Sequence, residues 1–288
     1  MTNTEIPFEL NRYLKASGAT KPDLFDWSDP GPALDDDALF CLGYMMDIES
    51  HTIIYLRELL STAVVREPDI TAFLACWAYE EFFHSETLKR FLASQKVTID
   101  DRRFAQLRRQ PPSDRIITAL ARIVSPMTRH FPAVHMTWGA INELSTLTGY
   151  QALIRQTRHP LLTTILNRII KDERRHFAFY FGQARRRLAP RAARLMTSFL
   201  LRRFWAPVGS PVRGAAAADR VCAYLFSDPE GAASLHALDT VIAGLPGLEW
   251  FNLASLHCAG SSGAAPARDC AVMVGSPDLQ SWPNSQTM

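Results

Sequence analysis

Apolar residues recur every three or four positions along four long segments of this chain, a spacing that predicts amphipathic α-helices. The first expected helix covers about 35–66, and the second covers 68 to about 94. The third covers about 132–156, and the fourth runs from 160 to about 188. Because only short breaks separate the first helix from the second and the third from the fourth, the pattern predicts two antiparallel helical hairpins.

The remaining segments predict shorter elements and irregular ends. Residues 1–35 are rich in Pro, Gly and Asp and are expected to form an irregular arm with short helical turns. Residues 36–258 would form one helical domain, and 259–288, rich in Gly, Ser, Ala and Pro, a disordered tail. Shorter helices are expected at about 113–124, at about 191–205, after Pro211, and at about 230–242. No strand-like alternation occurs, so the expected fold class is all-α.

Composition narrows the classes of protein that the pattern allows. The 288 residues are 47% hydrophobic, enough for a large core, and the net charge of +2 gives no general indication of nucleic-acid binding. The five Cys are scattered with no CxxC pair, so neither a disulfide framework nor a zinc knuckle is expected. No signal peptide and no apolar run of about 18 residues is visible, and we therefore expect a cytoplasmic protein.

A few ionisable residues lie on the apolar stripes of the four long helices. Burying a polar side chain there is costly unless the side chain has a partner. Two Glu-x-x-His motifs supply four of these residues, and chance alone would supply only about a third of one such motif. A single Glu about thirty residues before each motif supplies the other two. The six residues are Glu49 in the first helix, Glu81 and His84 in the second, Glu143 in the third, and Glu173 and His176 in the fourth.

Four carboxylates in one core would repel each other strongly unless cations neutralised them. Two divalent metal ions balance four carboxylates in formal charge, and the two imidazoles would complete the coordination. The i, i+3 spacing places the carboxylate and the imidazole of each motif on one helix face. Oxygen-rich coordination with one nitrogen per metal suits iron or manganese better than zinc. The pattern therefore predicts a carboxylate-bridged two-metal centre.

Taken singly, these residues have simpler interpretations. Either Glu49 or Glu143 could be a core carboxylate held by hydrogen bonds, and Asp47 is an alternative to Glu49 that lies off the stripe. Glu80 and Glu86 flank the first motif, also off the stripe, and are predicted to be solvated. The agreement of all six positions with the apolar stripes favours the metal centre.

The two motifs resemble those of a known family. Residues 77–84, W-A-Y-E-E-F-F-H, are similar to the W-x-x-E-E-x-x-H segment of soluble acyl-carrier-protein desaturases, and 172–176 to their D-E-x-R-H segment. The resemblance covers about 36–190 and implies a ferritin-like four-helix bundle with extra C-terminal helices, in which the six residues bind the metals. It also implies that Asp172 orients a ligand His, and that Thr146 lies near the oxygen-binding face and relays protons. A Thr bonded to its own helix backbone is the simpler interpretation of Thr146.

This family resemblance implies an oxidase that uses O2 and two external electrons to desaturate or hydroxylate an acyl chain. Its cofactors would be two iron ions, with manganese possible, and its electron donor a protein such as ferredoxin. A homodimer is also implied. The alternatives are an N-oxygenase of an amine, which Ile169 disfavours because such enzymes carry an extra His there, a non-enzymatic iron-binding protein, and a metal-free helical scaffold.

Two further features have both a functional and a simpler interpretation. A cluster of Arg follows the fourth helix and could dock an acidic acyl carrier protein, although a solvated helix surface, a polyanion or a membrane surface would explain it too. Its members are Arg185, Arg186, Arg187, Arg191, Arg194, Arg202 and Arg203. Aromatic residues near the ligands could wall an acyl channel or be ordinary core. They are Trp77, Phe83, Phe177 and Tyr180.

Overall fold

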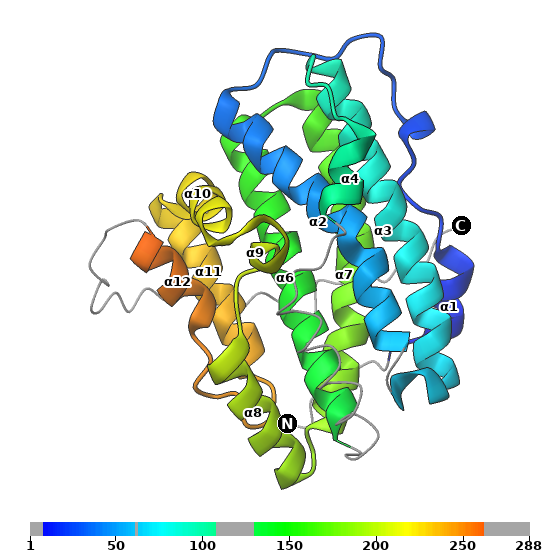
Figure 1. Cartoon of the computed structure of the whole chain (residues 1–288), viewed down its shortest axis with the longest axis vertical. Helices are drawn as coiled ribbons and strands as arrows, with labels where there is room; N and C mark the ends of the chain where they lie inside the picture. The colour runs from blue at the N-terminus through cyan, green and yellow to red at the C-terminus, as the bar shows by residue number, and fades with distance from the viewer. Residues whose placement is uncertain (1–7, 61–62, 108–129, 262–288) are drawn as a thin grey trace, which may run out of the picture.

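The computed structural model describes residues 8–60, 63–107 and 130–261, and within these ranges every regular element is a helix (Figure 1). Four long helices form its centre and are called the four-helix core below. They are α2 (Asp36–Leu60), α3 (Pro68–Ser94), α6 (Phe131–Thr157) and α7 (Pro160–Arg187). The all-α prediction is confirmed, and the core helices match the expected positions closely, except that α2 ends several residues early.

Proline and side-chain caps set where several helices begin. α3 and α7 each have Pro in the first turn, where its missing N–H costs no hydrogen bond. His159 caps α7, because its Nδ1 accepts a hydrogen bond from the Leu162 amide at 3.2 Å. The same His159–Pro160 break reverses the chain between α6 and α7 and so forms the second hairpin.

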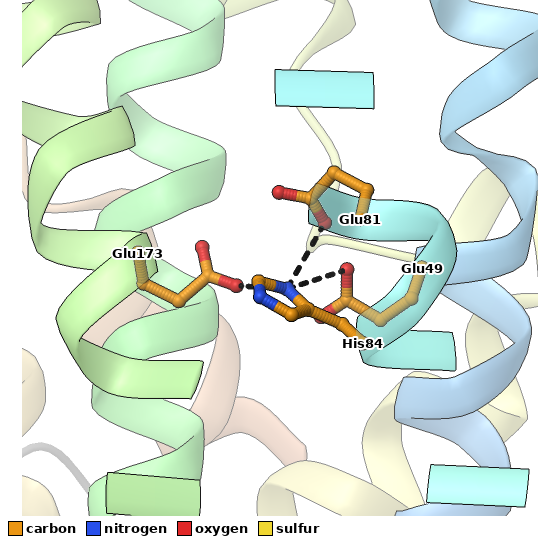
Figure 2. A group of neighbouring side chains, drawn as sticks. All are labelled: Glu49, Glu81, His84 and Glu173. Atoms are coloured by element: carbon orange, nitrogen blue, oxygen red, sulfur yellow. Dashed lines mark ion pairs between the residues drawn. The ribbon is translucent and has the colours of Figure 1, made fainter. Parts of the chain in front are cut away.

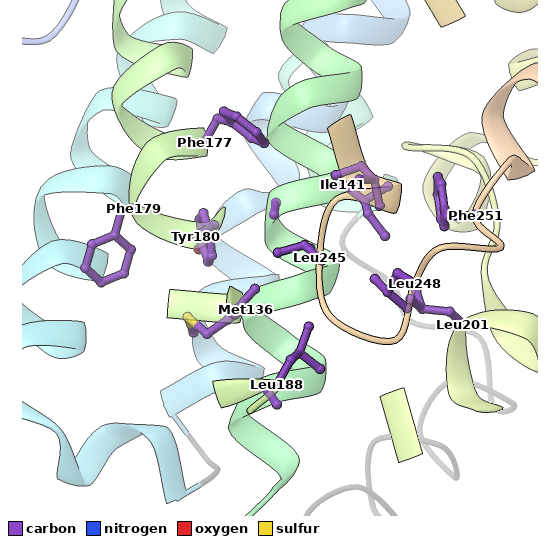
Figure 3. Packing of buried hydrophobic residues seen from close by; sticks show 14 of the residues in the cluster. Met136, Ile141, Phe177, Phe179, Tyr180, Leu188, Leu201, Leu245, Leu248 and Phe251 are labelled. Carbon is purple, nitrogen blue, oxygen red and sulfur yellow. The ribbon is translucent and has the colours of Figure 1, made fainter. Parts of the chain in front are cut away.

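Helices after α7 pack against one side of the core. They are α8 (Arg191–Phe204), α9 (Ser210–Arg213), α10 (Ala215–Phe226), α11 (Pro229–Ala243) and α12 (Leu253–Ser261). Figure 3 shows Leu245, Leu248 and Phe251 of this region facing Ile141 of α6, so one apolar cluster continues from the core into the later helices. We call α10, α11 and α12 the appended helices.

Several local expectations were wrong. The single helix expected after Pro211 is divided by Gly214, whose φ of +86° ends α9 before α10 begins. The expected tail starts too early, because α12 continues to Ser261. A short helix, α4 (Asp101–Leu107), lies in the Arg-rich connection where none was expected. The helix expected at 113–124 and the tail from 262 lie outside the described residues.

Two of the five cysteines are paired. Cys222 of α10 and Cys258 of α12 form a disulfide with their Cα atoms 5.6 Å apart. The scattered spacing gave no sign of this pair, because the two residues are 36 positions apart and meet only when the appended helices pack. In the described part of the chain, no helix is both long enough and apolar enough to cross a membrane.

The N-terminal arm lies along the four-helix core. Its described part contains α1 (Leu10–Ala16) and the 3-10 turn η1 (Pro22–Leu24), which agrees with the expected short helical turns. Figure 1 shows α1 beside α3. Tyr13 is only 3% exposed, so the arm is packed against the core rather than free of it.

Close packing of α6 on α7 gives a first prediction. A Cβ added at Gly139 would lie 2.4 Å from Cδ1 of Tyr180, a fully buried ring that also packs on Phe73. Gly139→Ala should therefore destabilise the fold by about 1–3 kcal/mol in urea denaturation. Gly182→Ala on α7 is the matched control, since nothing lies within 4 Å of its added Cβ. It should be neutral or stabilising by up to about 1 kcal/mol. Equal effects of the two changes would contradict the prediction.

Candidate metal centre

The four core helices bring all six predicted residues together in the interior. Each of the six is at most 6% exposed. Their ligand atoms form two groups, each containing three carboxylates and one imidazole, and the atoms within each group lie within 4.8 Å of one another. The first group contains Glu49, Glu81, His84 and Glu173, and the second contains Glu81, Glu143, Glu173 and His176.

His84 is the nitrogen donor of the first group (Figure 2). Its Nδ1 lies 3.3 Å from Oε1 of Glu173 and 3.7 Å from Oε2 of Glu81. Oε2 of Glu49 lies 4.0 Å from the same nitrogen. Figure 2 shows the three carboxylates converging on the ring from different helices, so this group depends on the packing of α2, α3 and α7.

His176 is the nitrogen donor of the second group. Its Nδ1 lies 3.0 Å from Oε1 of Glu81, and 3.5 Å from both Oε2 of Glu143 and Oε2 of Glu173. Glu81 and Glu173 thus each direct one oxygen to His84 and the other to His176. Two carboxylates that divide their oxygens between neighbouring groups have the arrangement needed to bridge two metal ions.

Each histidine also contacts a further acid through its other ring nitrogen, Nε2. Nε2 of His84 lies 3.1 Å from Oδ2 of Asp172, and Nε2 of His176 lies 2.8 Å from Oε2 of Glu80. Each acid comes from the opposite hairpin, so the two pairs cross. The predicted orienting position of Asp172 agrees with this geometry. The prediction that Glu80 is solvated was wrong, because Glu80 is fully buried between α3 and α7.

The N-terminal arm and Arg175 complete the surroundings of these two acids. Tyr13 and Ser17 donate hydrogen bonds to Glu80 at 2.7 and 2.9 Å, and Thr20 donates to Asp172 at 2.9 Å. Arg175 donates to Asp172 and, at 3.2 Å, to Glu80. These donors favour the ionised carboxylates, which in turn fix the orientation of the imidazoles.

The two carboxylates that belong to one group only are also held by hydrogen bonds. Trp77 Nε1 donates to Oε1 of Glu143 at 3.0 Å, and the Tyr150 hydroxyl donates to Oε1 of Glu49. In both cases the second oxygen, Oε2, is the one that approaches a histidine. Trp77 therefore positions a carboxylate of the site.

Burial and charge shift the pKa values in this site in opposite directions. Burial, together with neighbouring carboxylates, raises the pKa of Glu49 and of Glu143 well above the usual range. Burial would lower the pKa of His84 and His176, but the surrounding carboxylates outweigh it and raise both pKa values well above normal. These raised pKa values favour protonated glutamates and histidines, and the protons offset the negative charge of the carboxylates when no metal is bound.

The donor set fits a metal pair. Nδ1 of His84, Nδ1 of His176, Oε1 of Glu81 and Oε1 of Glu173 are buried, and among the described residues none has a partner in hydrogen-bond geometry. Buried polar atoms without such partners are costly and need an explanation. All four point into the two groups, whereas the Nε2 atoms on the far side of each ring are occupied. Cations between the carboxylates would satisfy them.

Asp47 is excluded as a member of the site. It is fully buried, but Arg103 of α4 and Arg213 of α9 bind it at 2.7 and 2.8 Å. Thr146 lines a cavity together with Glu49. Ser145 and Thr148 donate hydrogen bonds to carbonyls one turn earlier, whereas Thr146 makes no such bond to the described residues. Its hydroxyl is thus available to the cavity.

The Arg cluster is only partly available to a partner. Arg187 pairs with Glu67, and the guanidinium of Arg202 lies 3.7 Å over the ring of Trp250. Arg194 donates to the Ala189 carbonyl at 3.0 Å. The exposed members are Arg185, Arg186, Arg191, Arg202 and Arg203. The four aromatic residues considered for an acyl channel, Trp77, Phe83, Phe177 and Tyr180, do not line the cavity that reaches Glu49.

The sequence was compared with models of known protein families and with functionally curated proteins, and neither comparison finds a match. The functional interpretation therefore depends on the geometry of this site.

The two crossed acids give a second prediction. Glu80→Ala and Asp172→Ala should each weaken metal binding about 10–100-fold, because each leaves one imidazole without the group that orients it. A competition titration against a chromophoric chelator would measure both affinities. Glu86→Ala on α3 is the matched control, since Glu86 belongs to neither group. If Glu80→Ala bound metal as tightly as Glu86→Ala, the orienting role of Glu80 would be excluded.

Proposed function

We propose that this chain is a ferritin-like di-iron oxidase that uses O2 to desaturate or hydroxylate an unactivated C–H bond. One observation carries the proposal: Glu81 and Glu173 each divide their two oxygens between the two histidine-containing groups. Oxygen-rich coordination with one imidazole per metal supports iron, with manganese as the second choice. Two redox-active metal ions bound by these residues would supply the chemistry that oxidises the substrate.

The chain itself supplies geometry, exclusion of water and proton transfer. Trp77 and Tyr150 hold the two outer carboxylates, and the crossed acids hold the imidazoles, so the donor atoms are positioned before metal arrives. Asp172 acts here as a positioning residue. The Thr146 hydroxyl, on the cavity side, is the candidate group for moving a proton between the cavity and the site.

Partners are proposed from charge and from the chemistry that such a site needs. The exposed Arg residues of 185–203 would dock an acidic acyl carrier protein, since opposite charges accelerate and orient association. Two electrons per turnover would come from an external donor such as ferredoxin. A cytoplasmic homodimer is the proposed form of the protein.

Metal analysis and product analysis together test the proposal. Protein loaded with Fe²⁺ under anaerobic conditions and then desalted should retain about two ions per chain, according to the two ligand groups. Turnover with ferredoxin, its reductase and a panel of acyl carrier thioesters should yield products lighter by two hydrogens or heavier by one oxygen. Retention of no iron would overturn the metal assignment. Iron retention with conversion of amines alone would replace C–H oxidation by N-oxygenation.

A further inference from the structure

A cavity lies between the four-helix core and the appended helices. α2 and α6 form one wall, and residues 205–208 with α10, α11 and α12 form the other. Its volume is about 110 Å³, measured as the space open to the centre of a water molecule. Most of its surface is apolar, and Val221, Leu225 and Leu238 line the appended side. An apolar hollow of this kind is the usual form of a small-molecule site.

The cavity reaches the first metal group. Glu49, whose Oε2 faces His84, is among the lining residues, and Thr146 of α6 lies in the same wall. The other five ligands do not line the cavity. A molecule in the cavity would therefore approach the metal centre from the Glu49 side, past the Thr146 hydroxyl.

Polar groups in the lining are few, and several already bond within the protein. The Tyr44 hydroxyl donates to the Val208 carbonyl at 2.7 Å, and Ser145 donates to its own helix. His257 also lines the cavity, and its Nε2 lies 3.1 Å from Oδ1 of Asp219. The indole N–H of Trp205 is buried in the lining, and among the described residues it has no hydrogen-bond partner. A charged headgroup placed here would lose most of its hydration among apolar side chains, and an anionic one would also meet the carboxylate of Glu49.

We propose that this cavity binds the substrate, and that the substrate portion it takes is a neutral, largely apolar body such as an alkyl chain or a small ring. This rests on the proposed oxidase function and specifies its substrate class. The appended helices limit the size of the body, because their residues Ala218, Val221 and Leu238 line the cavity. The Cys222–Cys258 disulfide joins α10 to α12 within that wall and keeps its two halves together.

Displacement of a fluorescent neutral probe, 1-aminoanthracene, by 1-octanol tests the cavity without any need for metal. Ala218→Phe fills the space and should weaken octanol binding by roughly tenfold or more, since the added ring displaces at least about two methylene groups of the alcohol. Leu238→Ala enlarges the space and should shift the preference from 1-octanol towards 1-decanol. Leu245→Ala is the matched control, because Leu245 is equally buried in the same region but does not line the cavity. The control should bind both alcohols as the unchanged protein does.

Octanoate, with the same number of carbon atoms, should displace the probe less well than 1-octanol, because its charge would meet the Glu49 carboxylate. Equal octanol affinity in the unchanged protein and in Ala218→Phe would overturn the proposal, and so would a shift in preference caused equally by Leu238→Ala and Leu245→Ala. Because opposite shifts are expected from filling and enlarging the cavity, simple misfolding of one variant would not imitate the result.

Paramagnetic relaxation by Mn²⁺-loaded protein places the bound alcohol. Octanol protons should relax faster with the unchanged protein than with Ala218→Phe at the same manganese content. Displacement by octanol without this enhancement, in protein that holds manganese, would show that the alcohol binds elsewhere and would overturn the proposal. Protein that holds no metal but binds octanol as expected would instead contradict the proposed function and leave the cavity assignment standing.

Discussion

Glu173→Ala is expected to abolish retention of both metal ions, whereas Glu49→Ala should leave about one ion per chain. Glu173 contributes an oxygen to both ligand groups, and Glu49 contributes to the first group only. Removing Glu173 leaves each group with two carboxylates and one imidazole, and also removes one of the two carboxylates that the groups share. Metal analysis after anaerobic iron loading and desalting measures the difference directly.

Two controls make this comparison specific. Glu143→Ala, the counterpart of Glu49→Ala in the second group, should also retain about one ion. Glu86→Ala should retain as many ions as the unchanged protein. Circular dichroism would confirm that each variant remains helical. Equal metal loss in Glu49→Ala and Glu173→Ala would show that the two carboxylates are equivalent and would contradict the bridging arrangement.

The stability of the metal-free protein should fall as the pH rises from about 5 to about 8, while that of the metal-loaded protein should not. The pKa of Glu49 and of Glu143 is raised by burial, so the folded chain holds protons that the unfolded chain has released. The unfolding free energy therefore decreases as the pH rises above the ordinary Glu value. The raised pKa values of His84 and His176 act in the same direction, because their stabilisation is complete below the ordinary His value and is lost above it.

Metal binding reverses this dependence because metals and protons compete for the same ligand atoms. The pKa of Glu81 is lowered, so its contribution is already constant within this pH range. Free metal at about a thousand times its dissociation constant adds roughly 4 kcal/mol per site. Thermal unfolding with and without Mn²⁺ should thus show a difference in Tm that widens with pH. A constant difference would contradict the charge balance inferred for the site, and Glu173→Ala should show almost no difference at any pH.

The six candidate ligands could be predicted from the sequence because both signals that mark them are local. Helical periodicity defines which residues face the interior, and a carboxylate on that face is unusual enough to be noticed. Glu49 and Glu143 were identified in this way, although neither belongs to a motif. Helical periodicity does not indicate which carboxylates belong to both ligand groups. The structure shows that these are Glu81 and Glu173.

Glu80 was missed because its burial has a tertiary cause. Glu80 lies on a face of α3 that would be exposed to solvent if α1 and Arg175 did not cover it. A signal did exist in the sequence: an acid directly precedes the Glu of both motifs, as Glu80-Glu81 and Asp172-Glu173. Comparing the two motifs with each other would have assigned equivalent roles to Glu80 and Asp172.

The cavity could not be predicted from the pattern of the long helices. One of its walls consists of α10, α11 and α12, and their position against α2 and α6 depends on contacts between residues far apart in the chain. Aromatic residues close to the motifs in sequence were therefore the wrong candidates. Phe177 and Tyr180 pack in the same apolar cluster as Phe73, and neither lines the cavity.

The crossed pairs of His84 with Asp172 and of His176 with Glu80 have a consequence for how the molecule assembles. Neither hairpin contains a complete half of the site: each ligand group, and each histidine with its acid, draws on both. A partly folded chain with only one hairpin formed would hold metal poorly. Metal uptake would then indicate that the two hairpins have packed together. The bound ions would also act as cross-links that resist separation of the hairpins.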